Sequence, residues 1–262
     1  MRKTTYILIV RILLSLIVIV GICSCSNASE PNKDEHTTNN VSTFIMDLSI
    51  KDYPDKVVTR TDSEWVEGDS IFLLFESEKG LAYGIAVYND QAWSVDYDGK
   101  LNENKASKCK TFFFQNKVSY AHSKISLNAQ SIIYEDSIGE YNLKDGCLSV
   151  KATLKPKTGR IRFKGENHLD IKFSGISFYT SFNRFTGEFQ KSNSQLSSKV
   201  DGEYTPYYYG YFTDPDERPI KIWSEEGNFV RYFPENSLAP GISGYVTIPT
   251  KEEHNGWLFL FE

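Results

Sequence analysis

Apolar and polar side chains alternate with a period of two along much of this chain. The apolar residues Phe44, Met46, Leu48 and Ile50 alternate with Ile45, Asp47 and Ser49. The same period runs through residues 148–154, 161–163 and 169–173. It is typical of antiparallel strands that bury one face. Beyond residue 24, no window of about twelve residues shows the spacing of an amphipathic helix, so the sequence predicts an all-β protein.

Short clusters of turn residues separate the predicted strands. They lie at Asp98-Gly99, 155–159, Ser174-Gly175, 214–216 and 226–228. Many short strands with regular turns and no intervening helices are typical of antiparallel β-sandwiches. We expect two of them, an N-terminal sandwich over residues 43–146 and a C-terminal sandwich over residues 147–262. The boundary precedes the hairpin that starts at Cys147.

The first 24 residues have the composition of an export signal. Arg2 and Lys3 precede the uncharged apolar segment 12–22, which is shorter than the roughly 20 residues of a membrane span. The segment ends Ile22-Cys23-Ser24-Cys25, which resembles a bacterial lipobox with Cys25 as the lipid acceptor. The alternative is an uncleaved signal anchor. We expect residues 1–24 to be a lipoprotein signal peptide, and acyl chains such as palmitate on Cys25 to hold the protein on the outer membrane.

Residues 25–42 contain almost no apolar side chain after the cysteine, so they are expected to be a disordered tether. Without the leader, the chain keeps 26 basic and 34 acidic groups, a net charge of −8. This charge gives no electrostatic reason to bind a phosphate backbone, and we expect no nucleic-acid partner.

No constellation typical of catalysis or of metal binding is present. The four histidines, at positions 36, 122, 168 and 254, form neither an HExxH nor a His-x-His motif. The segment Gly241-Ile242-Ser243-Gly244 lacks one residue of a nucleophile elbow. We therefore expect a protein that is not an enzyme and that holds no metal or cofactor.

Five tyrosines lie within residues 204–211. In a strand, Tyr207, Tyr209 and Tyr211 share one face, and Tyr208 and Phe212 share the other. If the first face is exposed, it is a candidate surface for stacking on sugar rings or for adhesion. The alternative is that one face is core and the other only partly exposed.

The two cysteines beyond the anchor, Cys109 and Cys147, leave two alternatives open. An envelope location permits a disulfide, which would contribute about 2–4 kcal/mol. Cys147 begins an alternating strand, however, and a buried free thiol there fits the pattern equally well.

Several short segments, in this order, resemble one family. They are Arg60-Thr61, residues 65–71 (WVEGDSI), Tyr88, Trp93, residues 159–163 (GRIRF), residues 175–179, 205–210 and 244–249, and residues 254–257. Together they resemble the fimbrillin-like lipoproteins of Bacteroides and related Bacteroidetes, from about Phe44 to Glu262. The resemblance implies two transthyretin-like β-sandwich domains on a surface lipoprotein. It also implies a role in adhesion, or in pili whose subunits assemble by strand exchange.

In the best-known members of that family, a protease cuts after an arginine that follows the first strand. The groove left by this strand then receives a strand of another pilin subunit. Arg60 is the matching position here. The short chain, which ends on the predicted strand 257–261, favours a tip, accessory or stand-alone protein over a shaft subunit. The alternative function is a carbohydrate-binding surface lipoprotein of a glycan-uptake system, with the tyrosine face holding a glycan or host ligand.

Overall fold

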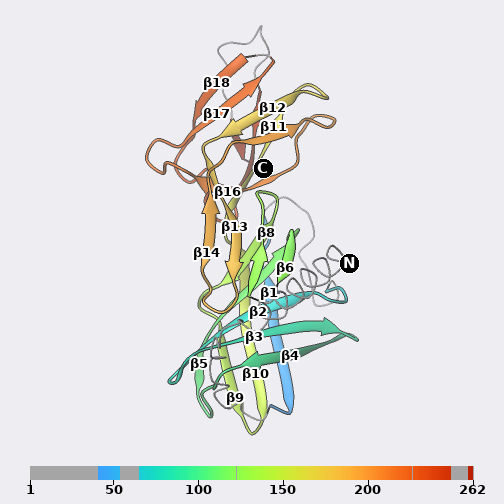
Figure 1. Cartoon of the computed structure of the whole chain (residues 1–262), viewed down its shortest axis with the longest axis vertical. Coiled ribbons are helices and arrows are strands. Elements are labelled where there is room, and N and C mark those ends of the chain that lie inside the picture. Colours follow the sequence, from blue (N-terminus) through green and yellow to red (C-terminus); the bar gives the residue numbers. More distant parts are fainter. Residues whose placement is uncertain (1–40, 54–64, 122, 226, 249–258, 262) are drawn as a thin grey trace, which may run out of the picture. The chain divides into compact units, whose positions relative to one another are not determined.

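The computed structural model describes residues 41–53, 65–121, 123–225, 227–248 and 259–261. All regular elements in these ranges are strands (Figure 1), which confirms the all-β prediction. Within the same ranges, no helix is long and apolar enough to cross a membrane. The predicted signal peptide, residues 25–40 of the predicted tether including Cys25, and Arg60 lie outside the described residues. The last two residues of that tether belong to the folded part: Val41 packs on the first core, and the Ser42 backbone N–H donates to the Gly146 carbonyl.

The first sheet contains the first strand of the chain at one edge. Its strands, in spatial order, are β1 (Thr43–Ile50), β10 (Cys147–Pro156), β8 (Ile132–Asp136), β5 (Ala106–Gln115), β2 (Ser70–Ser77), β3 (Gly80–Asn89) and β4 (Ala92–Asp98). A further strand, β9 (Glu140–Lys144), pairs with both β10 and β5. The inward side chains of β1 and β10 pack against those of β2 and β5, and they form one apolar core.

The second and third sheets enclose another core. The second sheet runs β20 (Phe259–Phe261), β19 (Ser243–Thr247), β11 (Gly159–Lys164), β16 (Tyr208–Phe212), β13 (Ile176–Asn183), β7 (Lys124–Ser126) and β6 (Ser119–Ala121), with β14 (Phe189–Ser192) beside β13. The third sheet runs β15 (Leu196–Lys199), β12 (Asp170–Ser174), β17 (Pro219–Ser224) and β18 (Gly227–Tyr232). Phe163 and Tyr208 of the second sheet pack against Phe173 of the third, at ring distances of 4.6 and 4.8 Å.

A third apolar cluster joins the first sheet to one end of the second. Phe72 of β2 and Phe112 and Phe114 of β5 face away from the first core. They pack on Ile125 of β7 and Phe182 of β13. Strands β2 and β5 are therefore apolar on both faces, which explains the continuous apolar runs in their sequences.

The predicted boundary at Gly146 falls inside the β9–β10 hairpin. Asp145 and Gly146 both have positive φ values, of 50° and 75°, as a tight hairpin turn requires. Because β10 pairs with β1 and β9, it belongs to the first sheet. The chain enters the second sheet first at β6 and β7, returns to the first sheet with β8, β9 and β10, and enters the second sheet again at β11. The division into two transthyretin-like domains stays a prediction.

Candidate functional site

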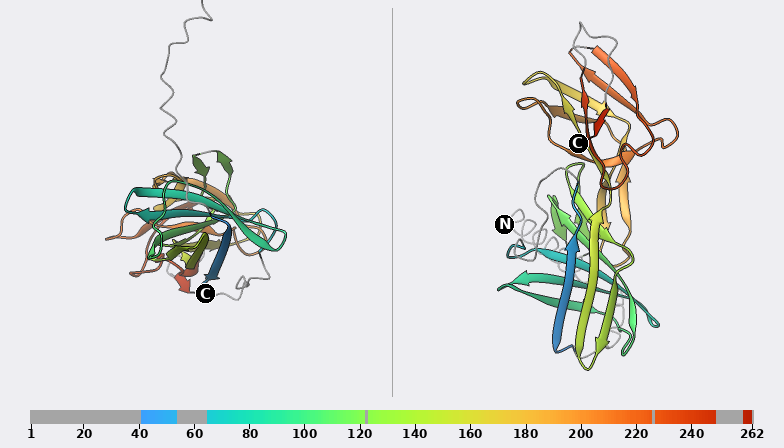
Figure 2. Two further views of the ribbon diagram at one scale, coloured as in Figure 1. Left: turned by 90° about the horizontal axis from the view of Figure 1, so that it is seen from below. Right: turned by 180° about the vertical axis from the view of Figure 1, so that it is seen from behind.

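Strand β1 occupies an edge of the first sheet and pairs with β10 in a parallel arrangement. The register runs without a break from Thr43 opposite Cys147 to Ile50 opposite Leu154. Figure 2 shows β1 (blue) beside β10, and the order of strands in the sheet places no described strand on the other side of β1. The segments are about 100 residues apart in sequence, so only tertiary structure holds β1 in place.

The inward side chains of β1 complete the first core. Leu48 and Ile50 are each 8% exposed, and Phe44 and Met46 pack half-buried on the same cluster. Burial of a side chain such as Leu48 contributes about 1.5–3 kcal/mol. The outward side is polar except for the exposed Ile45, and the Ser49 hydroxyl donates to Thr153 Oγ1 at 3.1 Å. Removing β1 would therefore expose an apolar slot and the hydrogen-bonding edge of β10 together.

The residues just after β1 tie this strand to the second sheet. The ring of Tyr53 is buried, with 5% exposure, and its hydroxyl donates to the Thr158 carbonyl at 2.9 Å. The ring lies 5.8 Å from that of Tyr209, and the Arg160 guanidinium lies 4.5 Å from its centre. Burial raises the pKa of Tyr53 well above its usual range. Tyr53 thus acts as an aromatic anchor at the end of β1.

A carboxylate next to the anchor adds a second connection. Asp52 Oδ1 accepts a hydrogen bond of 2.8 Å from the Tyr134 hydroxyl of β8 and another of 2.8 Å from the Tyr53 backbone N–H. Burial, followed by the charge of Asp52, raises the pKa of Tyr134. No sequence pattern marked Asp52 or Tyr53, because neither belongs to a run of alternating residues and their partners come from distant strands.

The predicted tyrosine face is largely packed. Tyr209 is only 8% exposed, whereas Tyr207 and Tyr211 are half-buried. Tyr208 and Phe212 point into the core between the second and third sheets, as the alternation predicted. Because Tyr209 is covered by Tyr53 from the β1 segment, it does not offer a bare ring to a sugar, and a glycan role for Tyr207 and Tyr211 stays a prediction.

Two arginine side chains of β11 lie against the rings of these tyrosines. The Arg160 guanidinium lies 4.2 Å from the ring centre of Tyr207, and the Arg162 guanidinium lies 4.7 Å from the same ring and 3.9 Å from that of Tyr204. We name Tyr53, Arg160, Tyr207, Arg162 and Tyr204 the arginine–tyrosine ladder. Each desolvated cation–π contact contributes about 0.5–2 kcal/mol, so the ladder fixes the end of β1 against β11.

The two cysteines are free thiols, and the disulfide considered from the sequence is not formed. Cys109 is completely buried in the first core, and burial raises the pKa of its thiol to about 12. Cys147 lies half-buried at the first position of β10, opposite Lys144 and Thr43. The backbone N–H of Cys109 donates to the carbonyl of Gly139, just before β9, whereas Cys147 lies opposite Lys144, the last residue of β9. The two thiols are therefore at different ends of this strand.

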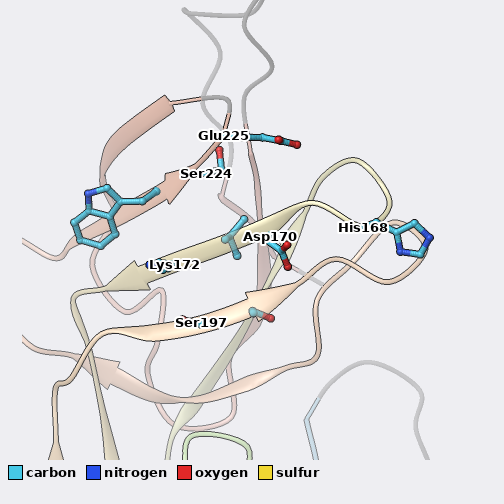
Figure 3. A pocket seen from close by; sticks show the side chains of 9 residues that line it. His168, Asp170, Lys172, Ser197, Ser224 and Glu225 are labelled. Carbon is cyan, nitrogen blue, oxygen red and sulfur yellow. The ribbon is translucent and has the colours of Figure 1, made fainter.

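An open hollow of about 660 Å³ lies over β12 in the third sheet. Figure 3 shows the side chains that border this β12 hollow, which include Asp170 and Lys172 of β12, Ser197 of β15 and Ser224 of β17. Trp223 of β17 also lines it. His168 is exposed beside the hollow, and within the described ranges no three His, Cys, Asp or Glu residues are placed to hold a metal ion.

Comparison with known proteins gives similarity to solved structures alone. No family model matches the chain. No curated protein matches it either. Solved structures do match it. The chain is similar to Bacteroidetes fimbrial and candidate cell adhesion proteins.

A candidate cell adhesion protein of Bacteroides ovatus shares 13% identity over 86% of this chain and 97% of its own, with a TM-score of 0.47. A fimbrial assembly protein of Parabacteroides distasonis shares 12% identity over 83% and 94% of the two chains, with a TM-score of 0.44. A candidate polysaccharide-binding protein of Bacteroides thetaiotaomicron shares 9% identity over 82% and 93%, with a TM-score of 0.45. Likenesses at these values decide no function.

Proposed function

We propose that this chain is a non-enzymatic, fimbrillin-like lipoprotein of the cell surface that acts in adhesion or as an accessory or tip component of strand-exchange pili. The observation that carries the proposal is β1, an edge strand that completes an apolar core through a single unbroken register with β10. Such a strand can be replaced by another chain, because the edge beneath it offers both unpaired backbone groups and an apolar slot.

The sequence features outside the described residues complete the proposal. Cys25 carries the acyl chains that anchor the protein in the outer membrane, and residues 26–40 let the folded part stand away from the lipid. Arg60 lies seven positions beyond Tyr53. Cleavage there would separate β1 and its anchor from the rest of the chain, so both the slot and the Tyr53 site would become available to a pilin strand.

The test uses the mature chain from Ser26 and an arginine-specific protease. We expect the protein cleaved after Arg60 to take up a labelled peptide of residues 41–53, detected by fluorescence anisotropy, and the intact protein to take up none. An Arg60→Lys variant, which this protease does not cut at position 60, is the matched control. A second peptide with Leu48→Asp and Ile50→Asp should not be taken up, because the slot would receive two unpaired charges.

Two outcomes would overturn strand exchange as the function of β1. One is equal uptake of both peptides, which would indicate non-specific association. The other is cleaved and folded protein that takes up neither the peptide nor a strand of a co-expressed pilin.

The tyrosine face is not included in this proposal. Tyr209 is buried against the β1 segment, and the Tyr207 ring contacts two guanidinium groups. These contacts hold the end of β1 in place, and we assign the arginine–tyrosine ladder to that role rather than to binding an external ligand.

A further inference from the structure

The outer face of the third sheet places one large aromatic side chain among polar ones. Ile171, Phe173 and Ile222 point inward and are buried. Three neighbouring residues point outward: Lys172 pairs with Trp223 on one side and with Ser197 on the other. Trp223 is therefore on the solvent side of the sheet although it is the most apolar residue of that row.

The surroundings of Trp223 differ from those of the other described tryptophans. Trp65 and Trp93 pack edge to face on each other at 5.1 Å, and Trp65 also packs on Phe113 in the first core. Among the described residues, no aromatic ring packs on Trp223, and its side chain lines the open β12 hollow. Trp223 is half-buried, and the remaining part of its amphipathic ring is available to an external ligand in the hollow.

The polar lining supplies both hydrogen-bond donors and acceptors. Asp170 and Glu225 contribute carboxylates, Lys172 an ammonium group, and Ser197 a hydroxyl. Figure 3 shows these side chains around the hollow, from β12, β15 and the turn after β17. Sites for small ligands combine one apolar surface with a few polar groups that fix orientation, and the β12 hollow has this combination.

The chemistry of the lining selects among ligand classes. One lysine against two carboxylates does not favour a phosphate or another anion. A purely apolar ligand would leave the charged groups without partners. A saccharide fits, because the C–H face of a pyranose ring covers an indole while its hydroxyls both donate to carboxylates and accept from lysine and serine.

We propose that the β12 hollow is a saccharide-binding site in which Trp223 stacks on one sugar ring and Asp170 and Lys172 bond its hydroxyls. The site is open rather than enclosed, so it fits a segment within a glycan chain as well as a chain end. It shares no residue with β1 or with the arginine–tyrosine ladder. A saccharide bound here would give the surface protein an adhesive ligand of its own, independent of strand exchange.

The test is native affinity electrophoresis of the mature chain in gels that contain starch, dextran, xylan, mannan or mucin glycans. We expect at least one of these polysaccharides to retard the protein. Trp223→Ala should weaken the interaction about tenfold or more, since loss of a stacked ring removes more than about 1.4 kcal/mol. Trp223→Phe, which keeps a smaller ring, should retain part of the binding.

The matched control is Tyr232→Ala on the same sheet. Tyr232 is 67% exposed and lies opposite Pro219, away from the residues that line the hollow. Its loss should leave the retardation unchanged. If Trp223→Ala does not fold, as judged by circular dichroism, the exposed variants Asp170→Asn and Lys172→Ala decide the question by weakening retardation without unfolding the protein.

The proposal is overturned if no polysaccharide of the panel retards the wild-type protein, or if folded Trp223→Ala is retarded as strongly as the wild type. Neither result bears on the uptake of the β1 peptide, which depends on a different sheet. Conversely, failure of strand exchange would leave the saccharide result intact.

Discussion

At the scale of single residues, Tyr53 has the largest influence on the proposed mechanism. Its hydroxyl bonds Thr158, in the turn before β11, and its buried ring contacts Arg160 and Tyr209 of the second sheet. Sequence alternation predicted that Tyr207, Tyr209 and Tyr211 share a face. It could not predict that Tyr209 is covered, because the covering ring comes from a segment more than 150 residues earlier.

Truncation of the anchor should weaken the docking of β1. We expect Tyr53→Ala to lower the free energy of unfolding by about 3–5 kcal/mol, since a large buried ring is removed. Tyr53→Phe should cost only about 0.5–1.5 kcal/mol, because it loses the hydrogen bond to the Thr158 carbonyl and keeps the ring. Urea unfolding of both variants measures the difference.

The control for this series is Tyr232→Ala, which removes an exposed ring and should change stability by less than about 0.5 kcal/mol. Equal stability of Tyr53→Ala and the wild type would contradict the role of Tyr53 as an anchor.

The buried tyrosines also predict how stability depends on pH. Burial raises the pKa of Tyr53 and Tyr134 above the usual range, and that of Tyr179 to about 12. An unfolded tyrosine ionises near about pH 10. A group whose folded pKa is raised contributes stability that is fully present below the unfolded pKa and is lost as pH rises toward the folded pKa. The free energy of unfolding should therefore fall above about pH 10.

Urea unfolding at about pH 8 and about pH 11 measures this decrease in the free energy of unfolding. Tyr134→Phe should show a smaller decrease between these two values than the wild type, because one ionisable ring has been removed. A Tyr120→Phe control, at an exposed position of β6, should match the wild type. Equal stability at both pH values would contradict the burial of these tyrosine hydroxyls.

At the scale of elements, local periodicity predicted the strands better than it predicted their partners. The alternation that marked Leu48 and Ile50, and that of Ile171 and Phe173, is confirmed by their burial. The parallel pairing of β1 with β10 was beyond sequence reasoning, because a period of two reports which face of a strand is buried and carries no information on its neighbour. For the same reason the sequence could not show that β10, which follows the predicted boundary near Gly146, pairs with β1 and β9 of the first sheet.

The two faces of β1 should respond differently to the same charge. Leu48→Asp places a carboxylate in the first core and should destabilise the protein by about 3–5 kcal/mol. Ser49→Asp, on the exposed face of the same strand, should cost less than about 1 kcal/mol. Thermal unfolding of both variants checks this, and an equal loss in the two would show that β1 does not have the register described above.

At the scale of the whole molecule, two cores are joined by the aromatic cluster around Phe72, Phe112 and Phe182. The proposed strand-exchange surface involves the first core, and the proposed saccharide site lies on the outside of the second. Local signals in the sequence indicated the class of fold, which is confirmed, and they predict an anchor at Cys25, which stays a prediction. It could not locate the β12 hollow, because Lys172, Ser197 and Trp223 meet only after three separate strands have paired.

Amide hydrogen exchange of β10 tests the central claim most directly. In the intact chain, the amides of residues 147–154 that face β1 should be protected. After cleavage at Arg60 and removal of β1, their protection should fall while that of β2 and β5 persists, and the peptide of residues 41–53 should restore it. If protection of β10 is unchanged after β1 has been removed, or if β2 and β5 lose protection together with β10, β1 is not a replaceable strand on a folded protein and the proposed function is contradicted.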